Sequence, residues 1–304
     1  MSALDQFKTR LKKRERILLD GALGTELQRR GIKTTLPLWS ADAVMKNPEV
    51  VKQIHRDYID ADAEILTTNT FRTNRRTFDH AKMPNEARGY TIRACELARE
   101  AIEESGKSDI LLAGSIAPVE DCYTPDLVPA KMDALIEEHA DMVRNLKDGG
   151  IDIVWVEAMN SVRETIAVLE AAKKYGMESA VSFICKPDGN LFDGDPIEDV
   201  IAAILPYSPL AILSNCSSAR SIGVALQRML SCTNIPCGVY ANGDGEPHPD
   251  QGWIFHGQHF PKEYAECARE WLDAGALIIG GCCGTTPEYI AGLRKIVDEY
   301  NVKN

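Results

Sequence analysis

The feature that most constrains the fold of this chain is a regular alternation of short apolar runs with longer segments of helical periodicity. The runs are continuously apolar, which is typical of parallel strands buried on both faces. Strict alternation over 304 residues predicts an α/β fold with a single domain over residues 1–304, a (β/α)8 TIM barrel. An open doubly wound sheet is the alternative, but no GxGxxG loop supports it. The eight predicted strands cover residues 16–20, 63–68, 109–115, 151–157, 177–184, 210–215, 235–242 and 276–280.

Helix start and stop signals lie between the predicted strands. Asn47-Pro48-Glu49 combines a cap with a first helical turn, and Ser161 with Glu164 forms a capping box. Gly149-Gly150 and Gly176 mark helix ends. Further helices are predicted near residues 85–105, 196–205, 217–231, 261–274 and 287–300.

The charge and cysteine content narrow the class of protein. A net charge of −11 argues against nucleic acid or an anionic membrane as a partner, so small-molecule substrates are expected. The start of the chain has no apolar signal core, and nine cysteines then indicate reduced thiols in a cytoplasmic protein. The six histidines show no metal-binding spacing, and His55, His80 and His139, in helical segments, are predicted to be surface residues. Sulfur is therefore the expected donor for any metal.

The barrel prediction places an active site at the carboxyl ends of the strands. A carboxylate or thiol ends four of the eight runs, which favours a catalytic centre over chance. The strand ends carry Asp20, Thr68-Asn69, Gly114-Ser115, Glu157, Ser182, Asn215-Cys216, Tyr240 with Asn242, and Cys282-Cys283.

Adjacent cysteines are the most specific of these features. Cys282 and Cys283 follow two glycines and lead into a helix start, where Thr285 or Thr286 can cap and Pro287 suits the first turn. Cys216 lies in the same strand-then-helix setting. Three thiolates with one open position are the ligand set of a catalytic zinc site, although cysteines are more often simply small buried residues. The other six, Cys95, Cys122, Cys185, Cys232, Cys237 and Cys267, share no spacing and are predicted to be structural or incidental.

The ligand set indicates a type of reaction. Zinc bound by three thiolates carries net negative charge and is a poor electrophile for hydrolysis. It is better suited to holding a substrate thiolate that stays nucleophilic, which implies alkyl transfer to a thiol. Asp20 and Glu157 can then bind a substrate ammonium group, with helix capping or turn formation as the alternative.

The motifs resemble those of the zinc-dependent homocysteine S-methyltransferase family over nearly the whole length. The resemblance implies a zinc barrel in which Cys216, Cys282 and Cys283 hold the metal. It also implies that the homocysteine thiolate is the fourth ligand and attacks a methyl group on a cationic sulfur or nitrogen, which yields methionine. The matching stretches are residues 20–27, 38–40, 67–71, 114–115, 182–183, 193–194, 215–216 and 280–287.

The same resemblance assigns roles to the residues at the strand ends. Asp20 and Glu157 are implied as catalytic residues that contact the homocysteine amino group or position the substrates. The implied substrate contacts are Asp20, Trp39, Ser40, Asn69, Phe71, Arg72, Glu157, Ser182 and Asn215.

Departures from the family pattern bear on the methyl donor. Many members that use sulfonium donors have Glu-Thr-x-Pro where this chain has Glu157-Ala158-Met159-Asn160. Betaine-using relatives surround the quaternary ammonium with aromatic rings, and two such positions here are Ala158 and Arg72. Trp39 and Phe71 alone make a thin cage. We therefore predict a sulfonium donor, S-methylmethionine or S-adenosylmethionine. Arg72 can bind the carboxylate of either donor; the alternative for Arg72 is that it is a surface residue.

Other functions stay open at this stage. One is a methyltransferase that uses betaine or another onium donor. Another is a non-catalytic barrel that senses zinc or thiols, against which the strand-end carboxylates argue. A third is an enzyme of the same fold with another acceptor, such as selenohomocysteine. The sequence does not rank close acceptors, name the donor or fix the oligomeric state.

Overall fold

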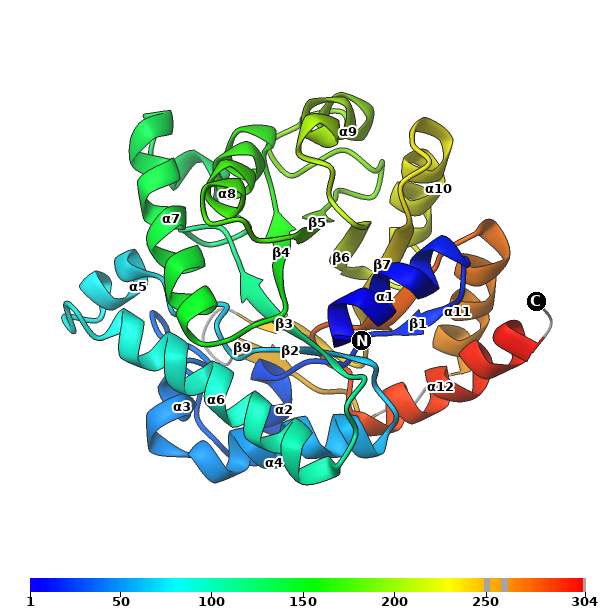
Figure 1. Cartoon of the computed structure of the whole chain (residues 1–304), viewed down its shortest axis with the longest axis horizontal. Helices are drawn as coiled ribbons and strands as arrows, with labels where there is room; N and C mark the ends of the chain where they lie inside the picture. Colours follow the sequence, from blue (N-terminus) through cyan, green and yellow to red (C-terminus); the bar gives the residue numbers. More distant parts are fainter. Residues whose placement is uncertain (249–251, 258–261, 303–304) are drawn as a thin grey trace.

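Eight parallel strands form a barrel in the computed structural model, which describes residues 1–248, 252–257 and 262–302 (Figure 1). The strand order is β1-β10-β7-β6-β5-β4-β3-β2, and a bridge between Leu19 and Ile65 joins the first and last strands. The predicted (β/α)8 barrel is confirmed. The barrel strands are β1 Ile17–Leu18, β2 Ile65–Thr67, β3 Leu111–Ile116, β4 Ile153–Met159, β5 Ser179–Ile184, β6 Ile212–Ser218, β7 Cys237–Asn242 and β10 Ile278–Gly281.

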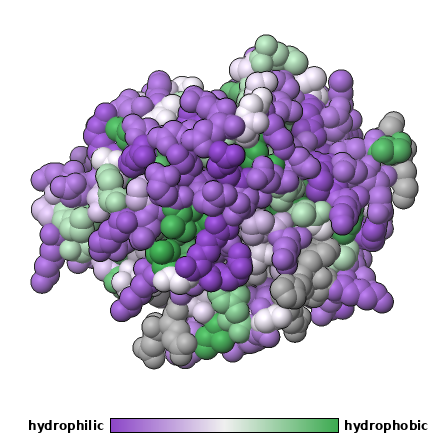
Figure 2. Space-filling model, turned by 90° about the horizontal axis from the view of Figure 1, so that it is seen from below, coloured by the Kyte–Doolittle hydropathy of each residue, from purple (hydrophilic) through white to green (hydrophobic). Residues whose placement is uncertain are grey.

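Helices form an outer ring around the strands (Figure 1). The side that faces downward in Figure 1 is mostly hydrophilic (Figure 2), as expected for helices that bury one face only. Among the described residues, no helix is long and apolar enough to cross a membrane. The helices are α1 Ala3–Lys12, α2 Gly24–Arg29, α3 Asp42–Lys46, α4 Pro48–Asp60, α5 Arg75–His80, α6 Ala87–Ser105, α7 Met132–Asp148, α8 Val162–Lys174, α9 Ile197–Ile204, α10 Ile222–Cys232, α11 Lys262–Ala274 and α12 Pro287–Val302, with short 3₁₀ turns η1 Pro125–Leu127 and η2 Leu205–Tyr207.

Two of the three histidine predictions are wrong. His55 and His139 are buried, whereas His80 is exposed as predicted. His139 lies four residues after the buried Leu135, on the apolar face of α7, and its ring contacts the Glu164 carboxylate at 3.0 Å. That contact also changes the predicted capping box. Ser161 accepts a hydrogen bond from the Glu164 amide, but the Glu164 carboxylate binds His139 and the Val119 amide instead.

Helix α1 closes the amino-terminal end of the barrel, a feature that the sequence analysis did not predict. It crosses that end in front of the strands in Figure 1. Its buried residues Phe7 and Leu11 join the core inside the barrel, which continues through Trp155 and Tyr240 and has Cys282 packed against it. One apolar column therefore runs from the closed end to the thiol-bearing end.

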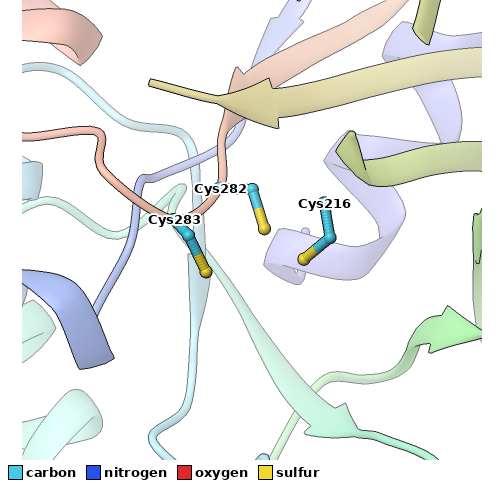
Figure 3. Close-up of side chains that lie close together, drawn as sticks. All are labelled: Cys216, Cys282 and Cys283. Carbon is cyan, nitrogen blue, oxygen red and sulfur yellow. The ribbon is translucent and has the colours of Figure 1, made fainter. Parts of the chain in front are cut away.

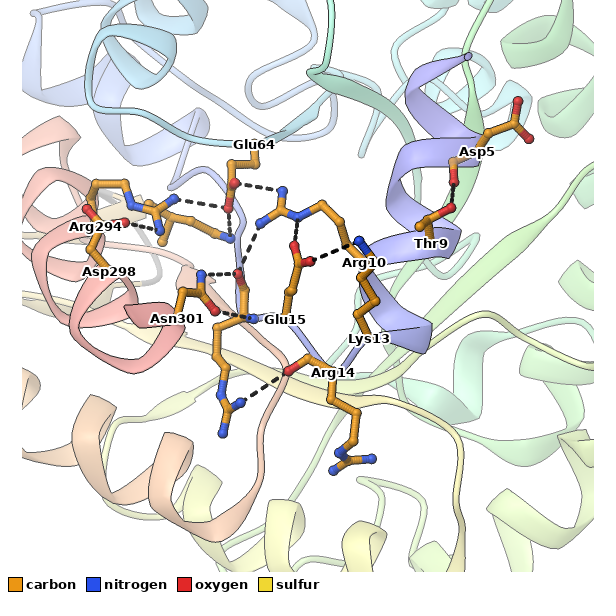
Figure 4. Close-up of polar contacts among 12 residues, drawn as sticks. Asp5, Thr9, Arg10, Lys13, Arg14, Glu15, Glu64, Arg294, Asp298 and Asn301 are labelled. Carbon is orange, nitrogen blue, oxygen red and sulfur yellow. Dashed lines mark hydrogen bonds and ion pairs between the residues drawn. The ribbon is translucent and has the colours of Figure 1, made fainter. Parts of the chain in front are cut away.

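A charged network ties α1 and α12 to the strands at this closed end (Figure 4). The Glu64 carboxylate lies at its centre, 2.7 Å from Arg10 Nη1 and 3.1 Å from Arg294 Nη1. Its Oε2 also accepts a hydrogen bond from the Leu18 amide at 2.8 Å. Because the β1–β2 pairing is short, the Glu64 carboxylate serves as the acceptor for the Leu18 amide, a role that a backbone carbonyl has in a longer strand pair.

Candidate functional site

A cavity of about 460 Å³ lies at the carboxyl ends of the strands. This volume is in the usual range for small-molecule sites. All three predicted metal ligands line it, as do most of the predicted substrate contacts. Ser182 and Asn215 do not line the cavity; both are fully buried behind it. The predicted residues that line it are Asp20, Trp39, Ser40, Asn69, Phe71, Arg72, Glu157, Cys216, Cys282 and Cys283.

Three thiols converge at the inner wall of this cavity. The Sγ atoms of Cys216, Cys282 and Cys283 all lie within 4.8 Å of one another and point toward a common space (Figure 3). A tetrahedral zinc with sulfur ligands at about 2.3 Å needs sulfur–sulfur separations of about 3.8 Å, which this arrangement nearly meets. Hydrogen bonds from the thiols of Cys216 and Cys283 lower the pKa of Cys282 well below its usual value. The cluster therefore favours a thiolate before any metal binds.

Unusual backbone conformations bring the cysteines together. Cys216 has a φ of 54°, and the register of β6 against β7 shifts between Asn215 and Ser218. Such a bulge turns a side chain away from the regular alternation of a strand. Gly281 allows the close approach of the Thr285 side chain, since a Cβ atom there would lie 2.3 Å from Thr285 Oγ1. That hydroxyl donates to the Cys282 carbonyl oxygen and accepts from the Ala22 amide, so it fixes the cysteine turn rather than capping α12.

Asn215 supports the thiols from behind. Its Oδ1 accepts hydrogen bonds from Ser182 Oγ at 2.7 Å and from the Ala158 amide at 3.0 Å. These two donors fix the orientation of the side-chain amide, and its Nδ2 then donates to Cys216 Sγ at 3.3 Å. Ser182 and Asn215 therefore orient and polarise the thiol cluster from behind.

Two carboxylates stand beside the thiols. Glu157 Oε1 accepts a short hydrogen bond from Ser115 Oγ, and its Oε2 accepts one from the Tyr240 hydroxyl at 3.2 Å. Burial raises the pKa of Glu157 to about 7, and the nearby Cys282 adds to the shift. Asp20 accepts hydrogen bonds from the Thr67 amide at 2.7 Å and from its hydroxyl at 3.1 Å, while burial raises its pKa well above the usual value. Both carboxyls would ionise more readily beside a bound cation.

Comparisons with known proteins identify the family. A family model described as homocysteine S-methyltransferase matches residues 17–297. The homocysteine S-methyltransferase of Escherichia coli (strain K12) is 32% identical over 97% of this chain and 99% of its own length. The chain belongs to the homocysteine S-methyltransferase family. It is therefore a methyltransferase, which confirms the predicted family and enzyme class.

Further relatives agree with this assignment. Homocysteine S-methyltransferase YbgG of Bacillus subtilis (strain 168) is 30% identical over 90% of this chain and 92% of its own. A selenocysteine methyltransferase of Astragalus bisulcatus is 28% identical and covers 92% of each chain. The crystal structure of the Escherichia coli homocysteine methyltransferase MmuM in its metallated form matches with a TM-score of 0.82 at 28% identity, over 95% of this chain and 98% of that one.

The outer half of the methyltransferase's cavity holds aromatic rings and one guanidinium. The rings of Trp39 and Phe71 meet edge to face, with centroids 5.9 Å apart. Arg72 lies over the Phe71 ring at 5.7 Å and pairs with Asp121, Nη2 to Oδ2, at 2.7 Å. The alternative of an unattached surface arginine is wrong, because only 11% of the Arg72 side chain is exposed.

The Asn69 side-chain amide donates to the backbone carbonyl of Ser40 at 2.9 Å. This bond fixes the loop after β2 against the segment that carries Trp39. Ser40 and Asn69 thus line the cavity as predicted, and each also holds the other in place.

Three residues that hold the carboxylates were given no role by the sequence. Ser115 and Tyr240 were placed at strand ends and Thr67 lies in a matching motif, so their positions could have suggested these contacts. Cys122, predicted to be structural or incidental, lines the cavity beside Tyr123.

A short hairpin, β8 Glu246–His248 with β9 Gly252–Ile254, also borders the cavity through His248 and Trp253. Asp244 holds the segment after it, because its Oδ2 accepts from the amides of His256 and Gly257 at 3.0 and 2.8 Å. Each strand of the hairpin has three residues, and only β9 is apolar, so neither was predicted as a strand.

Proposed function

We propose that this methyltransferase moves a methyl group from a sulfonium donor to the thiolate of homocysteine, with zinc held by Cys216, Cys282 and Cys283. The observation that carries the proposal is the cluster of three thiols in a cavity that also holds two carboxylates and an aromatic wall. Relatives named for homocysteine methylation support the acceptor.

The cysteine cluster fits zinc on its chemistry. Cys216, Cys282 and Cys283 would hold the ion at the wall of the cavity, and Asn215 would support it with a hydrogen bond to Cys216. When bound, zinc would supply a fourth coordination position that keeps a substrate thiol deprotonated and nucleophilic at neutral pH.

Asp20 and Glu157 would bind the homocysteine ammonium group. Each is buried and lines the cavity, so an ammonium group there would offset the burial of the negative charge. Held in this way, the acceptor sulfur attacks a donor methyl carbon. The new sulfur–carbon bond forms as the donor's bond breaks, and the electron pair of that bond returns to the donor sulfur, which becomes a neutral thioether.

The cationic donor would lie on the outer side, against Trp39 and Phe71. Cation–π attraction favours a sulfonium at the face of these rings. Arg72 makes a permanent quaternary ammonium such as betaine a poor occupant, since two cations in one partly dry pocket repel each other. A donor whose carboxylate lies several bonds from the sulfonium, as in S-methylmethionine or S-adenosylmethionine, can instead pair with Arg72.

A donor panel with metal analysis tests the proposal. Zinc-loaded protein with homocysteine is offered S-methylmethionine, S-adenosylmethionine, betaine and dimethylsulfoniopropionate, and methionine is measured. We expect turnover with one or both of the first two donors, little with betaine, and one zinc per chain with three sulfur ligands by X-ray absorption. Methionine formation from betaine alone would contradict the donor class, and no methionine from any donor would favour a sensor.

Cys282→Ser serves as the matched variant for the metal site. Structural zinc binding is worth roughly 10–16 kcal/mol over four ligands, so the loss of one ligand should weaken zinc binding on the order of a hundredfold or more. Full activity in this variant without bound metal would contradict the assignment of the metal site.

A further inference from the structure

The cavity separates its acidic groups into two places. Asp20 and Glu157 lie inside, where the charge of Glu157 helps to raise the pKa of Asp20 and Glu157 in turn lies near Cys282. Asp121 lies on the loop between β3 and α7, with its side chain 39% exposed. Among the described residues that line the cavity, Arg72 is the one arginine or lysine. It pairs with the Asp121 carboxylate.

The outer pair is held firmly from both sides. Asp121 Oδ1 accepts from the Tyr123 amide at 3.0 Å, while Oδ2 accepts from Arg72 Nη2. The next carbonyl along the loop, that of Cys122, accepts from Asn160 Nδ2 at 3.0 Å, so the end of β4 fixes the loop. Arg72 Nε is buried and has no hydrogen-bond partner within the described chain. A buried guanidinium nitrogen without a partner retains capacity for one more acceptor.

A carboxylate beside a guanidinium matches one kind of chemical group. An α-amino acid carries an ammonium and a carboxylate on the same carbon, so its ammonium can face Asp121 while its carboxylate faces Arg72. A simple onium carboxylate offers only the second contact and leaves Asp121 without a new partner. Phe71 joins the two parts of the outer cavity, because its ring contacts both the Arg72 guanidinium and the Trp39 ring.

We infer that Asp121 and Arg72 together bind the α-amino-acid group of the methyl donor, which makes Asp121 a residue that determines donor specificity. The inference rests on the proposed function, because it concerns the donor of that same reaction. It restricts the donor class to sulfonium compounds that keep both the ammonium and the carboxylate of an amino acid.

Three donors that differ by one group each test this inference. They are S-methylmethionine, its deamino analogue dimethylsulfoniobutanoate, and its decarboxy analogue aminopropyl dimethylsulfonium. For the unaltered enzyme we expect kcat/KM to be about tenfold or more higher for S-methylmethionine than for the deamino analogue, mainly through KM. If S-adenosylmethionine is the working donor, the same three compounds are compared as competitors of it, and the expected order of inhibition constants is the same.

Two variants assign the preference to the pair. Asp121→Asn should lower the preference for S-methylmethionine over the deamino analogue about tenfold, and Arg72→Gln should lower the preference over the decarboxy analogue. Asp141→Asn is the matched control, because Asp141 pairs with Arg75 on the outer helices and does not line the cavity. It should leave both preferences unchanged.

The outcomes distinguish this inference from the proposed function. If the unaltered enzyme treats S-methylmethionine and the deamino analogue alike, the inference fails while methyl transfer to homocysteine stands, and this comparison needs no variant. If Asp121→Asn weakens all three donors equally, Asp121 only holds Arg72 in place and the inference is also wrong. If no donor yields methionine and none competes, the proposed function itself fails.

Discussion

Two carboxylates close the same seam of the barrel at opposite ends, and they differ in one respect. At the closed end, Glu64 on the β2 side accepts a hydrogen bond from the Leu18 amide at 2.8 Å. At the open end, Asp20 on the β1 side accepts one from the Thr67 amide at 2.7 Å. Both therefore supply acceptors where β1 and β2 pair only briefly. Glu64, however, also lies against Arg10 and Arg294.

Asp20 has no such counter-charge. In the chain as described, it forms no ion pair with an arginine or lysine, and burial raises its pKa well above the usual value. A buried charge that is paired with opposite charges in the same chain is tolerated by the fold. A buried charge without a counter-charge lowers stability until a ligand supplies the counter-charge. The comparison teaches that one end of the seam is neutralised within the protein, whereas the other end presents a buried carboxylate to the cavity, where the proposed function places the substrate ammonium group.

The largest effect is expected from a substitution at the closed end of the barrel. Glu64→Ala removes the acceptor of the Leu18 amide and the partner of both arginines, so we expect the free energy of unfolding to fall by about 2–4 kcal/mol. Urea unfolding measures the change. Glu104→Ala is the control, because Glu104 also has two basic partners, Lys52 and Arg56, but lies on the surface; it should cost less than about 1 kcal/mol. Equal losses in the two variants would remove the special role of Glu64.

The converse effect is expected at the open end. Asp20→Asn should lower kcat/KM for homocysteine roughly tenfold to a hundredfold, because a charge-assisted hydrogen bond to the ammonium group is lost. Stability should not fall at neutral pH. Since the folded-state pKa of Asp20 is raised, its contribution to stability is present below the unfolded pKa and is lost as pH rises through the folded value. A variant that unfolds more easily at pH 7 while keeping its turnover would reverse the comparison.

Glu157 sharpens the comparison through pH. Its pKa is raised to about 7, chiefly by burial, so the ionised form that binds an ammonium group is lost as pH falls below that value. We expect kcat/KM for homocysteine to fall by up to about tenfold per pH unit on that side, as a property of the free enzyme. In Glu157→Gln this dependence on pH should disappear. The titration of homocysteine itself affects both proteins equally, so it does not alter the comparison. Identical pH profiles for the two proteins would show that another group controls the reaction.

The smallest effect concerns the support of the thiols. Ser182→Ala removes one of the two donors that orient the Asn215 amide, so the zinc dissociation constant should rise about threefold to tenfold. Competition with a chelator measures it. Ser214→Ala is a close control, because Ser214 is equally buried and donates to the Phe183 carbonyl on the neighbouring strand. The same change in both variants would indicate general loosening of the sheet.

The eight-stranded barrel and most helices could be predicted because strands and helices each leave a local periodicity in the sequence. All eight predicted runs overlap barrel strands, since buried parallel strands leave continuous apolar sequence, although β3, β4, β6 and β10 extend one to three residues beyond the predicted ends. Helix α1 was missed because only Phe7 and Leu11 are buried in a segment rich in charge. His55 was misplaced by residue type, although it lies four residues after Val51 on the buried face of α4.

The composition of the site was predictable only in part, for a different reason. The cysteines and carboxylates stand at strand ends, and the barrel topology alone brings strand ends together. The pairing of Arg72 with Asp121 joins two loops that are far apart in sequence, and no local pattern reports it. The same holds for the bonds of Asn215, whose partners come from β4 and β5.

Glu157 and Cys216 both lie where a strand leaves the regular register. Ala158 and Cys216 each have a φ of 54°, and β4 and β6 shift register at these points. The two-residue alternation of side chains in the barrel interior therefore ends before Glu157 and Cys216. The directions of Glu157 and Cys216 therefore depend on the local backbone at Ala158 and Cys216, and a substitution that restored regular strand geometry at either position would turn a side chain away from the cavity.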